Sequence, residues 1–318
     1  MDNEVMLKNF KDMLGFYGEN ISAAKYDAII NANKPAGRTL RRRFGSWLKA
    51  KNLALGKEEP QQPKILLLDI ETAPMEVLVW GLYKQHIPQS NIIEDWFCLG
   101  WSAKWLFDSD IMSDILSPKE AVAKSDERIL REIWKLLDEA DIVIAHNASK
   151  FDIRKLNARF LKYGLTPTSP YRVIDTLTVA KRNFALSSYA LTYICTLLGL
   201  PNKLNTSYGL WKKCIAGDKE SLKYMEKYNR QDIVALEEVY IELRPWIKGS
   251  INVGLYVETD KPICPNCGCT DLDWRGYYYT NVSKFRAFSC KGCGAIGRER
   301  TSSYPKDKRK ALVVSTAR

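Results

Sequence analysis

The sequence predicts an α/β protein: a mixed sheet flanked by helices, with a small all-α module before it and a cysteine-rich module after it. An apolar run at residues 64–71 is typical of a strand buried on both faces in the middle of a sheet. From residue 125 onward, apolar runs of strand length alternate with segments of helical periodicity. Five of the eight cysteines lie between residues 264 and 293, which predicts a separate module there.

The predicted elements follow from periodicity and from turn residues. Three short helices are expected at 5–17, 22–31 and 39–51, with Ser22 as a candidate N-cap. Three strands are expected to form a meander, at 64–71, 95–105 and 111–116. Helices then alternate with two further strands: helices at 125–140, 151–163, 189–198 and 218–243, strands at 142–145 and 172–175. This order predicts a mixed sheet with helices on both faces.

The net charge of +11 is unevenly distributed along the chain. Residues 1–60 hold 11 Lys and Arg against 7 Asp and Glu, and residues 261–318 hold 12 against 4, whereas the middle is nearly neutral with 25 against 26. Basic flanks around a neutral middle indicate modules that bind a polyanion, although a bias toward solubility is the alternative. No apolar run approaches the length of a membrane span, which predicts a cytoplasmic protein without a membrane partner.

Composition also predicts the domain boundaries. A basic helical module is expected at residues 1–57, and a polar linker interrupted by proline at 58–63. The α/β domain is expected at 64–250 and the cysteine-rich module at 261–301. The basic tail 302–318 is expected to be disordered.

Two carboxylates end the strand at 64–71. Because side chains alternate between the faces of a strand, Asp69 and Glu71 leave the same face at its carboxyl end, about 7 Å apart. Two like charges at the end of a core strand repel each other unless a cation neutralises them. Carboxylate oxygens suit Mg²⁺ or Mn²⁺. The alternative is an ordinary strand end that enters solvent.

Two further motifs contain a carboxylate, one just after a predicted strand and one on a predicted helix. Asp152 follows the strand at 142–145 and stands in the first turn of the next helix, where Ser149 could be the cap and Asp152 could simply favour the helix dipole. Tyr228 and Asp232 are spaced i and i+4, so they project from one helical face. The alternative for this pair is an amphipathic surface helix.

Together the motifs resemble those of the DEDDy subgroup of 3′→5′ exonucleases. The resemblance spans residues 64 to 247 and implies a ribonuclease H-like fold, two bound Mg²⁺ or Mn²⁺ ions and removal of nucleotides from the 3′ end of a nucleic acid. DNA is the favoured substrate, with RNA as the alternative. In the related DEDDh subgroup a histidine stands where this chain has Lys227, so a histidine general base is not expected. The motifs that carry the resemblance are Asp69-x-Glu71, Asn147-x-x-x-Phe151-Asp152 and Tyr228-x-x-x-Asp232.

Within that resemblance we assign each residue a hypothetical role. Asp69, Glu71 and Asp152 hold the ion that lowers the pKa of the attacking water, Asp69 bridges both ions and Asp232 completes the ligand set. Tyr228 orients the water, because an ordinary phenol with a pKa of about 10 is a poor base at neutral pH. Asn147 and Phe151 contact the substrate end, the ring by stacking on a base. Asp175 is a weaker candidate that supports the site indirectly.

The cysteines form two C-x-x-C pairs, Cys264 with Cys267 and Cys290 with Cys293, and resemble a zinc ribbon with one structural Zn²⁺. Cys269 is either a bystander or a replacement for Cys267. Between the pairs, basic and aromatic residues interleave, which suits single-stranded nucleic acid. A ribbon that only stabilises the fold or contacts a protein is the alternative.

The N-terminal module contains a basic stretch, with Arg41, Arg42 and Arg43 as candidate nucleic-acid contacts. Three short helices ending in a basic one suit a helix-turn-helix reader. Residues 37–48 also resemble a small helical repeat found in homing endonucleases and phage DNA-binding proteins, which implies a phage or bacterial setting and, if phage-encoded, the host cytoplasm. A solvated helix without a nucleic-acid role is the alternative.

The sequence therefore predicts a three-part nuclease. A nucleic-acid-binding or recruitment protein of the same fold without turnover is the rival from another class, but clustered acids have no physical use in an idle site. A transposase or integrase of the same broad fold is a second rival, and it calls for a late glutamate in place of the Tyr228 and Asp232 pair.

Overall fold

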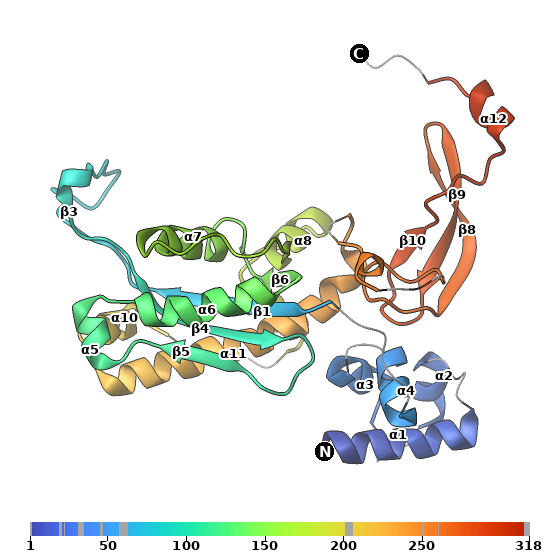
Figure 1. Ribbon diagram of the computed structural model, residues 1–318, viewed down its shortest axis with the longest axis horizontal. Coiled ribbons are helices and arrows are strands. Elements are labelled where there is room, and N and C mark those ends of the chain that lie inside the picture. Colours follow the sequence, from blue (N-terminus) through green and yellow to red (C-terminus); the bar gives the residue numbers. More distant parts are fainter. Residues whose placement is uncertain are drawn as a thin grey trace. The chain divides into compact units, whose positions relative to one another are not determined.

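The computed structural model of the chain describes residues 2–18, 21, 23–30, 35–44, 47–56, 63–200, 206–249, 251–257, 259 and 261–314. The chain divides into two compact units, Lys64–Tyr240 and the combination of Met1–Pro63 with Ile241–Arg318 (Figure 1). The unit Lys64–Tyr240 has a hydrophobic core, and the N-terminal and C-terminal segments of the other unit each have a separate one. In the described part of the chain, no helix has both the length and the apolar character needed to cross a membrane.

A five-stranded sheet forms the centre of the unit Lys64–Tyr240, in the order β5-β4-β1-β6-β7. β1 pairs antiparallel with β4 and parallel with β6, so the predicted mixed sheet is confirmed. β5 extends the antiparallel side and β7 the parallel side. The strands are β1 (Ile65–Thr72), β4 (Cys98–Trp105), β5 (Met112–Ile115), β6 (Ile142–Ala145) and β7 (Arg172–Asp175).

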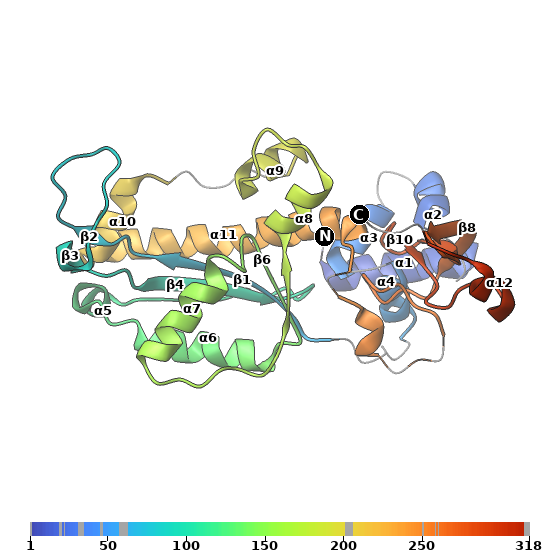
Figure 2. The same cartoon turned by 90° about the horizontal axis from the view of Figure 1, so that it is seen from above.

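Helices cover both faces of this sheet, as Figure 2 shows. α6 (Glu127–Glu139) and α7 (Asp152–Lys162) lie on one side, and the 25-residue α11 (Lys219–Leu243) lies on the other. Alternation along β1 sends every second side chain into the core shared with α6 and α7, and it turns Asp69 and Glu71 toward α11. The buried β1 residues of that core are Leu66, Leu68 and Ile70.

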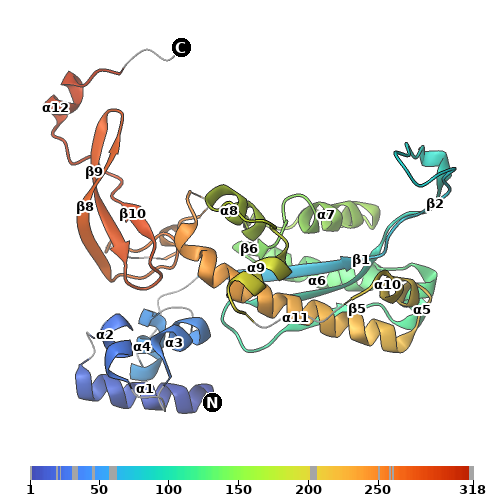
Figure 3. The ribbon, with the colours of Figure 1, turned by 180° about the vertical axis from the view of Figure 1, so that it is seen from behind.

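Several elements of this unit were not predicted. A two-stranded arm of β2 (Glu76–Val77) and β3 (Ile92–Glu94) leaves the sheet directly after β1 (Figure 3). The predicted strand 95–105 therefore begins only at Cys98, because the residues before it pair in the arm or connect it to the sheet. α9 (Leu191–Leu197) is close to its predicted range. The unpredicted helices are α5 (Pro118–Ala123), α8 (Thr176–Asn183) and α10 (Tyr208–Ile215).

The described residues of the N-terminal segment form four helices around a small core of their own. The predicted single helix at 39–51 is wrong, because α3 ends at Phe44 and α4 begins at Trp47. Gly45 and Ser46 separate the two helices in the sequence and lie outside the described residues, and glycine is a poor helix former. Ser22, the predicted N-cap, also lies outside the described residues. The helices are α1 (Asn3–Tyr17), α2 (Ala23–Ile29), α3 (Gly37–Phe44) and α4 (Trp47–Leu55).

The C-terminal segment contains a three-stranded sheet in the order β10-β9-β8. β8 (Leu272–Thr280) and β9 (Ser283–Cys290) form a hairpin, and β10 (Ile296–Arg298) pairs with β9. A bulge interrupts β8 before Tyr277, where Gly276 has the positive φ of +66° that glycine adopts easily. Part of the tail that we expected to be disordered forms the short helix α12 (Lys306–Ala311).

Candidate metal centres

Three carboxylates from two elements meet beside β1. One oxygen each of Asp69, Glu71 and Asp232 lies within 4.8 Å of the other two. Asp69 and Glu71 are partly buried, and Asp232, on α11, is only 4% exposed. Carboxylates this close repel one another in a partly desolvated site, and the repulsion is relieved when a cation lies between them.

Asn229 adds an amide to this acidic group. It lies three residues before Asp232 on α11 and therefore on nearly the same helical face. Its Nδ2 donates a hydrogen bond to Oδ2 of Asp69, and its Oδ1 is buried without a hydrogen-bond partner in the described part of the chain. The sequence motifs did not select Asn229; its spacing from Asp232 was the only available signal.

The donor set fits a hard divalent cation. All three carboxylates offer oxygen ligands, and the unpaired amide oxygen of Asn229 is a further neutral donor in the same place. Oxygen ligands of this kind suit Mg²⁺ or Mn²⁺, whereas softer metals prefer sulfur or imidazole. Neither histidine is a ligand at this site. His86 is exposed in the segment between β2 and β3. The Nδ1 of His146 lies 2.9 Å from Thr176 Oγ1, and its Nε2 lies 2.9 Å from the Tyr189 carbonyl oxygen.

Asp152 is held at the edge of β1 and not within that group of three. It is 2% exposed, and its Oδ1 accepts a hydrogen bond from the Ile70 amide at 3.3 Å. The described pairing of β1 with β6 ends at Leu67, so Ile70 lies beyond its neighbouring strand and Asp152 supplies the missing acceptor. The pKa of Asp152 is raised to about 7. Burial is the largest cause and the charge of Asp175 adds to it, while hydrogen bonds from its own amide and the Ile70 amide act in the opposite direction.

Asp175 fixes the loop that carries Asn147 and Phe151. Its carboxylate accepts hydrogen bonds from the amides of Asn147 at 3.0 Å and Ser149 at 3.3 Å, and it also caps α8. The predicted cap of α7 at Ser149 is wrong, because the cap position is Phe151 and Ser149 lies in this loop. Asn147 has φ of +76°, a left-handed conformation that asparagine tolerates better than most residues.

The predicted substrate contacts lie in different parts of the chain. Phe151 packs against the core of the sheet unit, with Lys155 Nζ 5.5 Å from its ring centroid. Arg42 and Arg43 are exposed on α3, which belongs to the other unit. The side chain of Arg41 lies outside the described residues.

The phenol of Tyr228 faces the acidic group from α11. Burial raises its pKa, and the charges of Asp232, Glu71 and Asp69 raise it further in that order, while a hydrogen bond with Thr206 lowers it. The result is a pKa above that of an ordinary phenol. Tyr228 therefore stays protonated at neutral pH and can donate a hydrogen bond, but it cannot accept a proton as a base.

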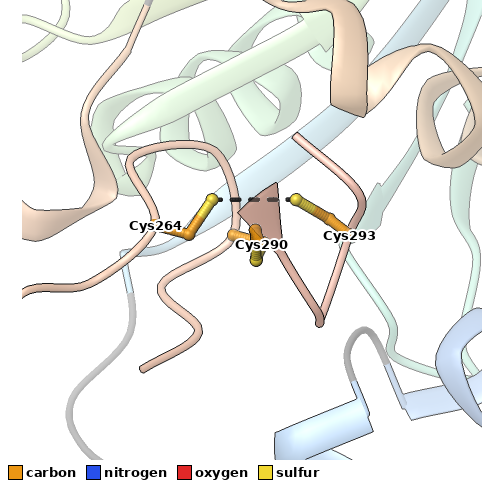
Figure 4. Close-up of side chains that lie close together, drawn as sticks. Cys264, Cys290 and Cys293 are labelled. Atoms are coloured by element: carbon orange, nitrogen blue, oxygen red, sulfur yellow. Dashed lines mark hydrogen bonds between the residues drawn. The ribbon is translucent and has the colours of Figure 1, made fainter. Parts of the chain in front are cut away.

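Four sulfurs form the second candidate centre. The Sγ atoms of Cys264, Cys267, Cys290 and Cys293 all lie within 4.8 Å of one another. The Sγ of Cys264 lies 3.7 Å from that of Cys293 (Figure 4), and the Sγ of Cys267 lies 3.6 Å from that of Cys290. A tetrahedral Zn²⁺ with bonds of about 2.3 Å requires sulfurs about 3.8 Å apart, so the four cysteines fit a structural zinc site.

Cys269 is buried next to this centre but is not one of the four. Its Sγ accepts a hydrogen bond from the Asp271 amide at 3.4 Å. A Cβ on Gly292 would lie 2.8 Å from that sulfur, so Cys269 leaves room only for glycine at position 292. The structure thus groups Cys267, and not Cys269, with the other three sulfurs.

Comparison with known families agrees with the sheet topology. Residues 110–244 match the family model of the RNase_H superfamily. The domain has a ribonuclease H-like fold. The match covers α7 and α11, which carry Asp152 and Asp232, and it begins after β1. Ribonuclease H-like domains act on nucleic acid, generally with divalent metals, and the match suggests a nuclease-type function for this domain. A search of curated proteins found no match to the chain.

The raised pKa of Asp152 in the ribonuclease H-like domain predicts a stability change that depends on pH. A buried carboxylate with a folded pKa of about 7 costs nothing below its unfolded pKa and destabilises increasingly as pH rises from about 4 to about 7. Asp152→Asn removes this cost and keeps an oxygen acceptor for the Ile70 amide. We expect the free energy of unfolding to gain about 2–4 kcal/mol more at about pH 8 than at about pH 4.5.

Urea unfolding without added divalent ions measures this difference. Asp108→Asn is the control, because Asp108 is exposed in the turn after β4. Equal gains at both pH values for Asp152→Asn would show that its carboxyl titrates normally.

Proposed function

We propose that the chain is a divalent-metal-dependent 3′→5′ exonuclease. The meeting of Asp69, Glu71 and Asp232 at the carboxyl end of a central strand in a ribonuclease H-like fold is the observation that carries this proposal. Phosphodiester hydrolysis develops negative charge on the attacking and leaving oxygens together, and an acidic group of this kind is the protein's means of holding cations beside both.

Asp69, Glu71 and Asp232 would hold two Mg²⁺ or Mn²⁺ ions together with Asp152 from the adjacent edge of β1. The bound ions would supply a lowered pKa for the attacking water and stabilisation of charge on the phosphate. Asn229 would fix the orientation of the Asp69 carboxylate through its Nδ2 hydrogen bond.

Tyr228 would position the attacking water by donating a hydrogen bond from its protonated phenol. Asp175 would keep the loop of Asn147 and Phe151 in place, so that the amide and the ring contact the terminal nucleotide. DNA is the proposed substrate. Arg41, Arg42 and Arg43 would add phosphate contacts from the helical module.

A strand-shortening assay tests the proposal. The full-length protein is incubated with 5′-labelled linear DNA and RNA, with Mg²⁺, with Mn²⁺ or without either. We expect a ladder of labelled products that shortens from the 3′ end only when a divalent ion is present, and no cut in a closed circular single strand. Internal fragments, or opening of the circle, would identify an endonuclease, and intact strands that shift on a gel would identify a binding protein.

Tyr228→Phe separates positioning of water from metal binding. Loss of the hydroxyl removes a hydrogen bond near the reacting water and leaves the carboxylates intact, so we expect kcat to fall about 10²-fold with little change in KM or in the Mg²⁺ concentration for half-maximal rate. Steady-state kinetics at several Mg²⁺ concentrations measure all three quantities. Unchanged kcat would remove Tyr228 from the mechanism.

A further inference from the structure

The β8–β9 hairpin carries two tyrosines and two cations on one face. The register places Tyr277 opposite Arg286 and Tyr279 opposite Lys284, so these four side chains leave the same face of the hairpin. We call this group the tyrosine face. Tyr278 lies between the two tyrosines in β8 and leaves the opposite face.

The tyrosine face is exposed and does not contribute to the core of its module. Tyr277 is 50% exposed and Tyr279 is 59% exposed, with their ring centroids 6.5 Å apart. The core of the module consists of the cysteines with Phe288 and Ala295, and Trp274 packs against it. Neither tyrosine belongs to that core, so packing does not explain why two large rings occupy these positions.

Positive charge accompanies the rings. Lys284 Nζ lies 3.7 Å from the centroid of Tyr277 and 5.8 Å from that of Tyr279. No described carboxylate lies within 4.0 Å of Lys284 Nζ. Glu299 pairs with Arg286 at 3.5 Å, but both side chains are partly exposed, so this pair is weak. Residues 261–318 hold 12 basic residues against 4 acidic ones, so the surroundings also favour a polyanion.

We propose that the tyrosine face binds single-stranded nucleic acid, with unpaired bases stacked on Tyr277 and Tyr279 and phosphates held by Lys284 and Arg286. Adjacent rings and ammonium or guanidinium groups match the alternation of bases and phosphates along a strand. A duplex is excluded as the main ligand, because its bases are already stacked on one another and cannot offer their faces to the rings. This binding is separate from the hydrolysis proposed at Asp69.

A closed circular single strand tests the proposal without involving a 3′ end. Binding of the labelled circle to the full-length protein is followed by fluorescence anisotropy. We expect the double variant Tyr277→Ala, Tyr279→Ala to bind at least about tenfold more weakly than the unaltered chain. Lys284→Gln should reduce the slope of log affinity against log salt concentration by about one.

Tyr278→Ala is the matched control, because Tyr278 has the same exposure, 51%, on the same strand and points to the other face. It should keep affinity within about twofold. Tyr277→Phe with Tyr279→Phe should also bind as the unaltered chain does, because stacking needs the rings and not the hydroxyls. Zinc content is measured for every variant to report on the fold of the module.

Three results would overturn the proposal: an unchanged affinity of the alanine double variant, an equal loss in Tyr278→Ala, or a tenfold loss in the phenylalanine pair. If the alanine double variant loses zinc, the affinity of the Tyr277→Phe, Tyr279→Phe variant and the salt dependence of Lys284→Gln still test the proposal. Because the circle has no end and turnover is not measured, failure of the exonuclease proposal would leave these outcomes unchanged. Failure of the unaltered chain to bind the circle would be a fourth result that overturns the proposal.

Discussion

Asp69→Asn should reduce nuclease turnover by about 10³-fold or more at saturating Mg²⁺, while the protein remains folded. Asp69 is central to the acidic group: its carboxylate lies with those of Glu71 and Asp232 and accepts the hydrogen bond of Asn229. An amide in its place keeps the shape of the side chain but removes a negative ligand. Single-turnover rates on 5′-labelled DNA measure the loss.

Stability distinguishes a lost ligand from a damaged fold. Without added divalent ions, removal of one of three neighbouring negative charges relieves repulsion, so the Tm of Asp69→Asn should equal or exceed that of the unaltered chain. Asp108→Asn, an exposed carboxylate of the same sheet unit, should keep full turnover. Turnover that survives in Asp69→Asn would mean that hydrolysis does not take place at this group.

Cys264→Ser should lower the zinc content of the purified protein from one per chain to less than about a tenth of that. Cys264 is fully buried, and its sulfur is one of four at the spacing of a tetrahedral Zn²⁺ site. Without the ion, the small core of cysteines has little apolar area to hold it together, so protease cleavage within residues 261–301 should also accelerate.

Cys269→Ser is the matched control for this prediction. Cys269 is equally buried and lies in the same module, but its sulfur is outside the group of four. Zinc content should stay at one per chain. Zinc loss in Cys269→Ser together with zinc retention in Cys267→Ser would assign the ligand position to Cys269.

The sequence predicted the parts of the site that depend on local periodicity. The buried strand and the shared face of Asp69 and Glu71 follow from the twofold alternation of a strand, which neighbours do not alter. The i, i+4 spacing likewise places Tyr228 and Asp232 on one face of α11. The two cysteines of each C-x-x-C pair are so close in sequence that the pattern alone predicts a group of four tetrahedral ligands.

Long-range contacts and the ends of some elements could not be predicted from local sequence patterns. The bond from the Ile70 amide to Asp152 depends on where β6 ends, and the role of Asn229 depends on how α11 lies against β1. The helix expected at 39–51 was drawn as one element because the local apolar pattern continues past Phe44, whereas α3 ends at Phe44 and α4 begins at Trp47. The arm of β2 and β3 has no core pattern, since most of its side chains are exposed.

Anomalous X-ray scattering from crystals grown with Mn²⁺ can show whether Asp69, Glu71 and Asp232 form a divalent-cation site. We expect Mn²⁺ peaks within about 2.3 Å of carboxylate oxygens from all three residues. Crystals that contain Mn²⁺ elsewhere, or nowhere, with these three carboxylates bound only to water and protein, would contradict this expectation.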